Sequence, residues 1–270
     1  MIENNPNNPF GGDKGPSPEH FAAQKQAISW GKPQEHAGPA WADNAGLGDH
    51  EQRLKLSRVF MNWVNGWMAA GLAVSGIAAF LTLSSPALLE TVAQYYWFFF
   101  IAELGMVFGL SAMLPKMSAR TAAAMFIAYA ALNGLTLSLL ALIYTATSIT
   151  KVFFITAGTY GAMAAIGITT KRDLTSMGSF LMMGVIAIFL AIIVNIFIGS
   201  TALDMAISVI GVLVFAGLTA YDIQKFKRAG YLGFANKEQA GRTAIMGALN
   251  LYLDFINMFI FLLRLFGDRR

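Results

Sequence analysis

Long apolar runs separated by short polar segments make up the chain from residue 51 onward. Each run is long enough for a helix of ~20 residues, at ~1.5 Å per residue, to cross a hydrocarbon core of about 30 Å. The seven runs cover residues 59–82, 92–114, 121–144, 152–170, 177–198, 203–224 and 244–266. The pattern predicts an all-α membrane protein in which residues 51–270 form a bundle of seven transmembrane helices.

Residues 1–50 have a different composition. They contain six of the eight prolines, many Asn, Gly and Gln residues, and few aliphatic ones. Such a segment buries too little apolar surface to offset the entropy lost on ordering. We therefore expect a disordered tail that precedes the membrane domain.

The composition limits the chemistry that the membrane helices can carry. Of the 270 residues, 56% are hydrophobic and 13% are charged, and the mean hydropathy is +0.55, which excludes an ordinary soluble globular protein. There is no cysteine, and the histidines are His20, His36 and His50, all before the first run. Thiol nucleophiles, Ser-His-Asp triads and His-ligated metals or haem are therefore excluded from the membrane helices. We expect no enzymatic activity, no cofactor and no binding of nucleic acid.

Lysine and arginine residues alternate between dense and sparse loops. The dense set consists of Arg53, Lys55, Arg58, Lys116, Arg120, Lys171, Arg172, Lys225, Lys227, Arg228, Lys237 and Arg242, and the sparse set, before the C-terminus, of Lys151. By the positive-inside rule, the N-terminus is cytoplasmic. Seven crossings then place Arg264, Arg269 and Arg270 outside, against the same rule. Either a short basic tail is tolerated there, or the last run is re-entrant and returns to the cytoplasm.

Three acidic residues interrupt the apolar runs. They are Glu103, Asp222 and Asp254. An ionised carboxylate at membrane depth costs several kcal/mol unless it is paired, hydrated or protonated, so such residues mark candidate functional sites. Glu103 has two interpretations: a role in ion coordination or proton movement, and a structural role as a hydrogen-bonding partner between helices.

Asp222 and Asp254 lie equally far along the sequence from residue 238, in the loop between the last two runs. In an antiparallel helical hairpin, residues equidistant from the turn lie at similar depth, so these two carboxylates can face each other. Two carboxylates in one desolvated site cannot both ionise cheaply and would titrate as a coupled pair. The pair is therefore a candidate proton sensor. The alternative is that each Asp separately hydrogen-bonds a neighbouring helix.

Several segments resemble the Bax inhibitor family of membrane proteins. They are residues 158–167, residues 169–180, the run FAGLTAYD at 215–222 and the run LYLDFIN at 251–257, and the similarity covers about residues 58–267. The resemblance implies a seven-helix bundle with the last helix at its centre. It also implies that Asp222 and Asp254 form a proton-sensing pair, and Glu103 matches an acidic position in the second helix.

One residue that the resemblance leads us to expect is missing. In some members of the family an arginine near the end of the second helix latches onto the aspartate pair. The matching stretch here has no arginine, and the basic residues near it are Lys116 and Arg120. These two are the candidate substitutes for the latch, although a lysine is not an equivalent bidentate donor.

The resemblance makes a pH-sensitive cation leak channel our first hypothesis, in a bacterial plasma (inner) membrane and with calcium as the ion. Calcium prefers oxygen ligands, which Asp222 and Asp254 would supply together with carbonyl groups and water. The alternative is a non-transporting regulator that binds another membrane protein, such as a quality-control protease, through its tail. A third hypothesis is an aspartyl intramembrane protease, because Tyr221 precedes Asp222, but Asp254 lacks the Gly-x-Gly-Asp context of that class.

Overall fold

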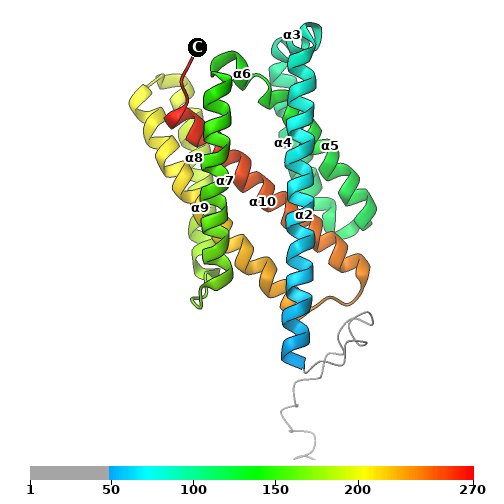
Figure 1. Cartoon of the computed structure of the whole chain (residues 1–270). Coiled ribbons are helices and arrows are strands. Elements are labelled where there is room, and N and C mark those ends of the chain that lie inside the picture. The colour runs from blue at the N-terminus through cyan, green and yellow to red at the C-terminus, as the bar shows by residue number, and fades with distance from the viewer. Residues whose placement is uncertain (1–48) are drawn as a thin grey trace, which may run out of the picture. The chain divides into compact units, whose positions relative to one another are not determined.

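The computed structural model describes residues 49–270, so the expected tail lies almost entirely outside the described residues. Figure 1 shows the helices. They are α2 (Asp49–Ser84), α3 (Pro86–Gln94), α4 (Tyr96–Met113), the 3-10 helix η1 (Leu114–Lys116), α5 (Ala119–Leu137), α6 (Leu140–Ile143), α7 (Ala146–Thr169), α8 (Thr175–Ile198), α9 (Thr201–Leu232) and α10 (Lys237–Phe266).

Seven helices in the described part of the chain are long and apolar enough to cross a membrane, with α5 and α6 together forming the third. Each corresponds to one of the seven apolar runs, which confirms the predicted all-α membrane fold. Large apolar side chains point outward along these helices, including Phe197, which is 86% exposed, and Phe108, which is 70% exposed. Surface of this kind is stable in lipid and not in water.

Polar caps and chain-breaking residues set the helix boundaries. Five side chains accept a hydrogen bond from a backbone N–H in the first turn of the helix that follows: Ser85, Ser118, Thr145, Ser200 and Asn236. Such caps satisfy donors that a helix start leaves unpaired. The second apolar run is divided at Tyr95, so Ser85 and Pro86 begin the short helix α3 rather than the membrane span α4.

The last helix, α10, is the central one. Of its most apolar segment, 72% is buried, against at most 39% in the other six spans. It contacts α2, α5, α7 and α9, and Leu251, Tyr252 and Met258 are fully enclosed. This confirms the arrangement expected from the family resemblance.

Of the two alternatives for the last run, the structure favours a full crossing over a re-entrant segment, because α10 is one continuous helix whose C-terminal end lies opposite its start in Figure 1. Residues near the C-terminus make an ion pair and hydrogen bonds with neighbouring helices. The Arg264 guanidinium lies 3.2 Å from the Asp204 carboxylate of α9. The backbone N–H of Arg270 donates to the carbonyl of Ile143 at 2.9 Å, and Asp268 is hydrogen-bonded to Ser148. Arg264 therefore has an acidic partner at this end, and the C-terminal backbone is hydrogen-bonded to the rest of the bundle.

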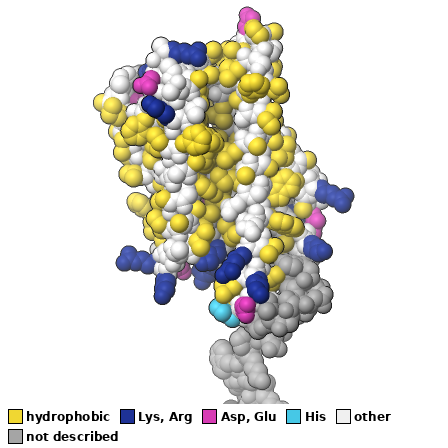
Figure 2. Space-filling model, in the orientation of Figure 1, with side chains coloured by type: hydrophobic (Ala, Val, Ile, Leu, Met, Phe, Trp, Pro, Cys, Tyr) yellow, Lys and Arg dark blue, Asp and Glu magenta, His cyan; other side chains and the backbone are white. Residues whose placement is uncertain are grey.

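Lysine and arginine side chains gather at one end of the bundle, where α2 begins and where α9 turns into α10 (Figure 2). We call this the basic end. It carries the whole dense set of Lys and Arg residues given above, whereas the opposite end has Lys151, Arg264, Arg269 and Arg270. The asymmetry predicted from the sequence is therefore present in the folded bundle.

Helices α2 and α5 approach each other closely at Gly134. A Cβ atom at this position would overlap the backbone oxygen and the Cα of Ser75. At Gly158, on α7, a Cβ atom would meet nothing within 4 Å. A side chain is therefore excluded at Gly134 and tolerated at Gly158.

Candidate functional site

A cavity of about 410 Å³ lies between α4, α8, α9 and α10. Most of its lining is apolar, but five polar side chains contribute to it: Ser111, Asp222, Asn250, Asp254 and Asn257. Two of these helices, α4 and α8, are the least buried of the seven candidate spans, and each has one main packing partner, α5 for α4 and α9 for α8. Two of the three candidate carboxylates from the sequence, Asp222 and Asp254, therefore line this cavity.

The α9–α10 hairpin brings Asp222 and Asp254 into this cavity. Both side chains are buried, with exposed fractions of 5% and 4%, and both line the same cavity. The sequence argument from equal distance to the turn therefore predicted their placement correctly. Their role as a proton sensor stays a prediction.

The two carboxylates have different partners. Asp222 is 3.4 Å from the Lys225 ammonium, one turn further along α9, and within hydrogen-bonding reach of Asn250 on α10. Asp254 has an oxygen, Oδ2, with no hydrogen-bond partner among residues 49–270. Leaving a charged oxygen buried and unpaired is expensive. Asp254 is therefore the group in this cavity with the strongest need for a proton, a water molecule or a cation.

A second buried polar group, on α7, is also unpaired. The hydroxyl of Tyr160, on α7, has no hydrogen-bond partner among the described residues. The Tyr160 ring packs edge-on against Phe255, the residue after Asp254, with ring centroids 5.9 Å apart. The sequence analysis did not identify this tyrosine, because a single Tyr in an apolar run carries no distinctive pattern.

Glu103 lies in a separate polar network and does not line the cavity. It accepts a hydrogen bond of 2.5 Å from the Thr136 hydroxyl and is within reach of Asn133. Asn133 in turn accepts a hydrogen bond of 2.9 Å from the Tyr252 hydroxyl. The Tyr252 hydroxyl also lies 2.7 Å from the Ser75 hydroxyl. The network joins α4, α5, α10 and α2. Of the two interpretations of Glu103, this geometry favours the structural one.

The cation beside the aspartate pair comes from α9. No ion pair joins Lys116 or Arg120 to either aspartate in the part of the chain that the structure describes. Lys225 lies beside Asp222 instead, and its ammonium is 5.1 Å from the centre of the Phe226 ring. This role of Lys225 was not predicted, although its spacing of three residues from Asp222 on one helix is typical of such a pair.

A further carboxylate, Asp173, lies outside the membrane spans, in the loop before α8. Asp173 accepts hydrogen bonds from the hydroxyl and backbone N–H of Thr175, which, with the nearby Arg228, lower the pKa of Asp173 below its usual value. A lowered folded-state pKa stabilises the fold above the unfolded pKa of about 3.9, and this contribution disappears as the pH falls through the folded-state value.

We expect Asp173→Asn to lower the melting temperature at pH 7 and to have little effect near pH 2. Thermal unfolding of both proteins in detergent across this range measures the difference. A deficit that is the same at both pH values would show that the Asp173 charge does not stabilise the fold.

Most of the described chain matches one protein family. The model of the family described as "Inhibitor of apoptosis-promoting Bax1" matches residues 57–270. The inner membrane protein YbhL of Escherichia coli K12 is 45% identical over 217 residues, covering 79% of this chain and 93% of that protein. Uncharacterized proteins of Deinococcus radiodurans and Borreliella burgdorferi are 43% and 40% identical, covering 81% and 83% of this chain and 94% and 98% of their own length. The matched region includes the whole aspartate cavity.

Proposed function

The chain belongs to the Bax inhibitor family, and on that premise we propose that it is a pH-sensitive cation leak channel of the bacterial inner membrane, with calcium as the transported ion. The membrane assignment follows the name of its relative YbhL. The basic end faces the cytoplasm in this proposal, by the positive-inside rule, so that the chain before α2 is cytoplasmic as well.

The observation that carries the proposal is the unpaired Oδ2 of Asp254 in a cavity that also contains Asp222. When the two carboxylates share a proton, they can remain close together. When both are ionised, their repulsion in a medium of low dielectric constant favours separation of α9 from α10. Helices α4 and α8, which are little buried and each have one main packing partner, can yield to that movement. Flux is therefore expected to rise with pH.

Calcium suits the oxygen atoms that this cavity offers. Two carboxylates and the side-chain oxygens of Asn250 and Asn257 line it, whereas calcium takes six to eight oxygen ligands. Among residues 49–270, no group of three or more His, Cys, Asp or Glu side chains could hold a metal ion. Water would complete the coordination, which favours brief occupancy and suits a leak pathway rather than storage.

The test is calcium release from vesicles that contain the purified protein and a calcium indicator. We expect release to increase as the pH is raised, and protein-free vesicles to show no such change. Release that is absent at every pH would overturn the proposal. If the same protein then co-purified with a specific membrane protease, the alternative function of a non-transporting regulator would replace it.

A further inference from the structure

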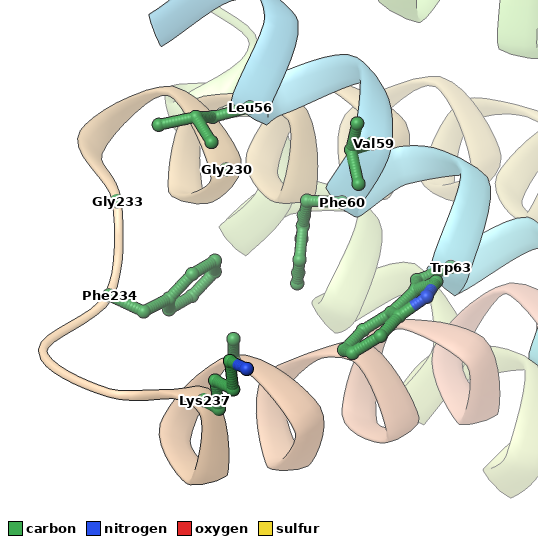
Figure 3. Close-up of a pocket in the computed structure, with 9 residues that line it drawn as sticks. Leu56, Val59, Phe60, Trp63, Gly230, Gly233, Phe234 and Lys237 are labelled. Atoms are coloured by element: carbon green, nitrogen blue, oxygen red, sulfur yellow. The ribbon is translucent and has the colours of Figure 1, made fainter. Parts of the chain in front are cut away.

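A second cavity, of about 310 Å³, lies at the basic end of the bundle. Its lining comes from the beginning of α2, the end of α9, the connecting loop and the start of α10. Figure 3 shows several of these side chains, which include Leu56, Val59, Phe60, Trp63, Phe234 and Lys237. All of this lining is apolar except for Lys237. We call it the α2–α10 pocket.

The local sequence explains why this pocket exists. Gly230 allows α9 to lie against α2, since a Cβ atom there would be 2.9 Å from the Phe60 ring. The Ser57 hydroxyl donates to the carbonyl of Lys227 at 2.8 Å and fixes the two helices together. Gly233, with φ of 83°, then turns the chain, and Phe234 packs against Phe60 with ring centroids 4.7 Å apart. Specific contacts between α2, α9 and the loop before α10 therefore fix the walls of the pocket.

The pocket lies at the depth where the membrane surface is expected. On α2, the charged stretch 51–58 ends and the apolar run 59–82 begins within its lining. Val59 and Trp63 are each 53% exposed, and tryptophan is enriched at the level of lipid head groups. One side of the pocket is therefore next to acyl chains and the other next to head groups.

Lys237 supplies a positive charge at the edge of this apolar space. Three other basic side chains of this end have acidic partners, with Lys55 3.3 Å from Glu51, Lys225 3.4 Å from Asp222 and Arg228 3.4 Å from Asp173. No ion pair of Lys237 occurs within residues 49–270. Its ammonium group is available for a negatively charged ligand.

We propose that the α2–α10 pocket binds an anionic phospholipid, with one acyl chain among Val59, Phe60 and Phe234 and the phosphate at Lys237. Apolar pockets with basic rims at the cytoplasmic ends of membrane helices suit this class of ligand. An extended peptide would fit poorly, because its backbone N–H and C=O groups would be buried against a lining that cannot pair them. An acyl chain has no such groups. The proposal does not depend on whether the protein conducts ions.

Native mass spectrometry of the full-length protein in detergent tests the head-group contact, with phosphatidylglycerol and phosphatidylcholine of identical acyl chains as probes. We expect phosphatidylglycerol to bind more tightly, and Lys237→Gln to weaken it about fivefold, the equivalent of about 1 kcal/mol per basic residue at an anionic surface. Lys171→Gln is the matched control, since Lys171 is exposed at the same end but outside the pocket. Equal losses in both variants would indicate general surface attraction and overturn the proposal.

A pocket-filling variant tests the acyl-chain contact. Val59→Phe is expected to weaken the binding of both lipids, because the larger phenylalanine side chain would occupy the space of the acyl chain. Ile77→Phe, on the same helix and 60% exposed, should leave binding unchanged. A photoreactive residue at position 59 should then cross-link to lipid. Cross-linking to residues 1–48 or to a second copy of the chain instead would show another occupant and overturn the proposal.

Discussion

Replacing Asp254 with asparagine is expected to abolish the rise of calcium flux with pH. Asparagine has nearly the same shape as aspartate but cannot release a proton, so the repulsion that separates α9 from α10 cannot develop. In the unmodified protein, release of one proton on opening should raise flux about tenfold per pH unit below the midpoint. The same loss is expected for Asp222→Asn, which also leaves Lys225 without its acidic partner.

The measurement is the pH profile of calcium release from vesicles that contain each variant at equal protein density. Asp173→Asn serves as the control, because it removes the same kind of charge at the basic end, outside the cavity. This control should keep the normal pH profile. An Asp254→Asn protein with the profile of the unmodified chain would contradict proton sensing by the pair.

Alanine at Gly134 is expected to destabilise the bundle strongly, although alanine favours helices by up to about 1 kcal/mol over glycine. Its methyl group would overlap the backbone of Ser75 and push α5 away from α2. Overpacking of this kind costs typically about 1–3 kcal/mol, or more where backbone must move. Displacement would also disturb Tyr252, whose hydroxyl lies 2.7 Å from that of Ser75.

Thermal unfolding in detergent, compared with Gly158→Ala, separates steric overlap from helix propensity. The Gly158 variant should be as stable as the unmodified protein or slightly more stable, because its methyl group meets nothing within 4 Å. Melting temperatures that are equal for the two variants would contradict the close packing of α2 and α5.

The helical spans and the depth of the acidic residues could be predicted from the sequence, since both depend on position along a helix axis. Hydropathy marks where each span begins and ends. Equal distance from residue 238 places Asp222 and Asp254 at similar depth, because each helical residue adds the same rise. The placement of both in one cavity agrees with this argument.

Which side of a helix a residue occupies could not be predicted with the same certainty. Glu103, like Asp254, lies near the middle of its run, yet α4 directs it toward Thr136 and Asn133 and away from the cavity. Lys116 and Arg120 were the candidate latch residues because they lie near the end of the second run in the sequence. The structure places Lys225 beside Asp222 instead. Rotation about the helix axis depends on packing against neighbours that are distant in the sequence.

The α2–α10 pocket also could not be predicted, because its walls come from segments separated by about 170 residues. Phe60 and Phe234 are each ordinary residues in their local sequence. Their contact depends on the close approach at Gly230 and on the turn at Gly233. A hydropathy profile contains neither of these features.

Infrared difference spectroscopy between low and high pH tests the central claim most directly, because it detects a protonated carboxyl group by its C=O stretch. We predict a carboxyl band that disappears over the pH interval in which calcium flux appears, and that no longer titrates there in Asp222→Asn or Asp254→Asn. A spectrum with no such band, or a titrating band that persists unchanged in both variants, would contradict the account.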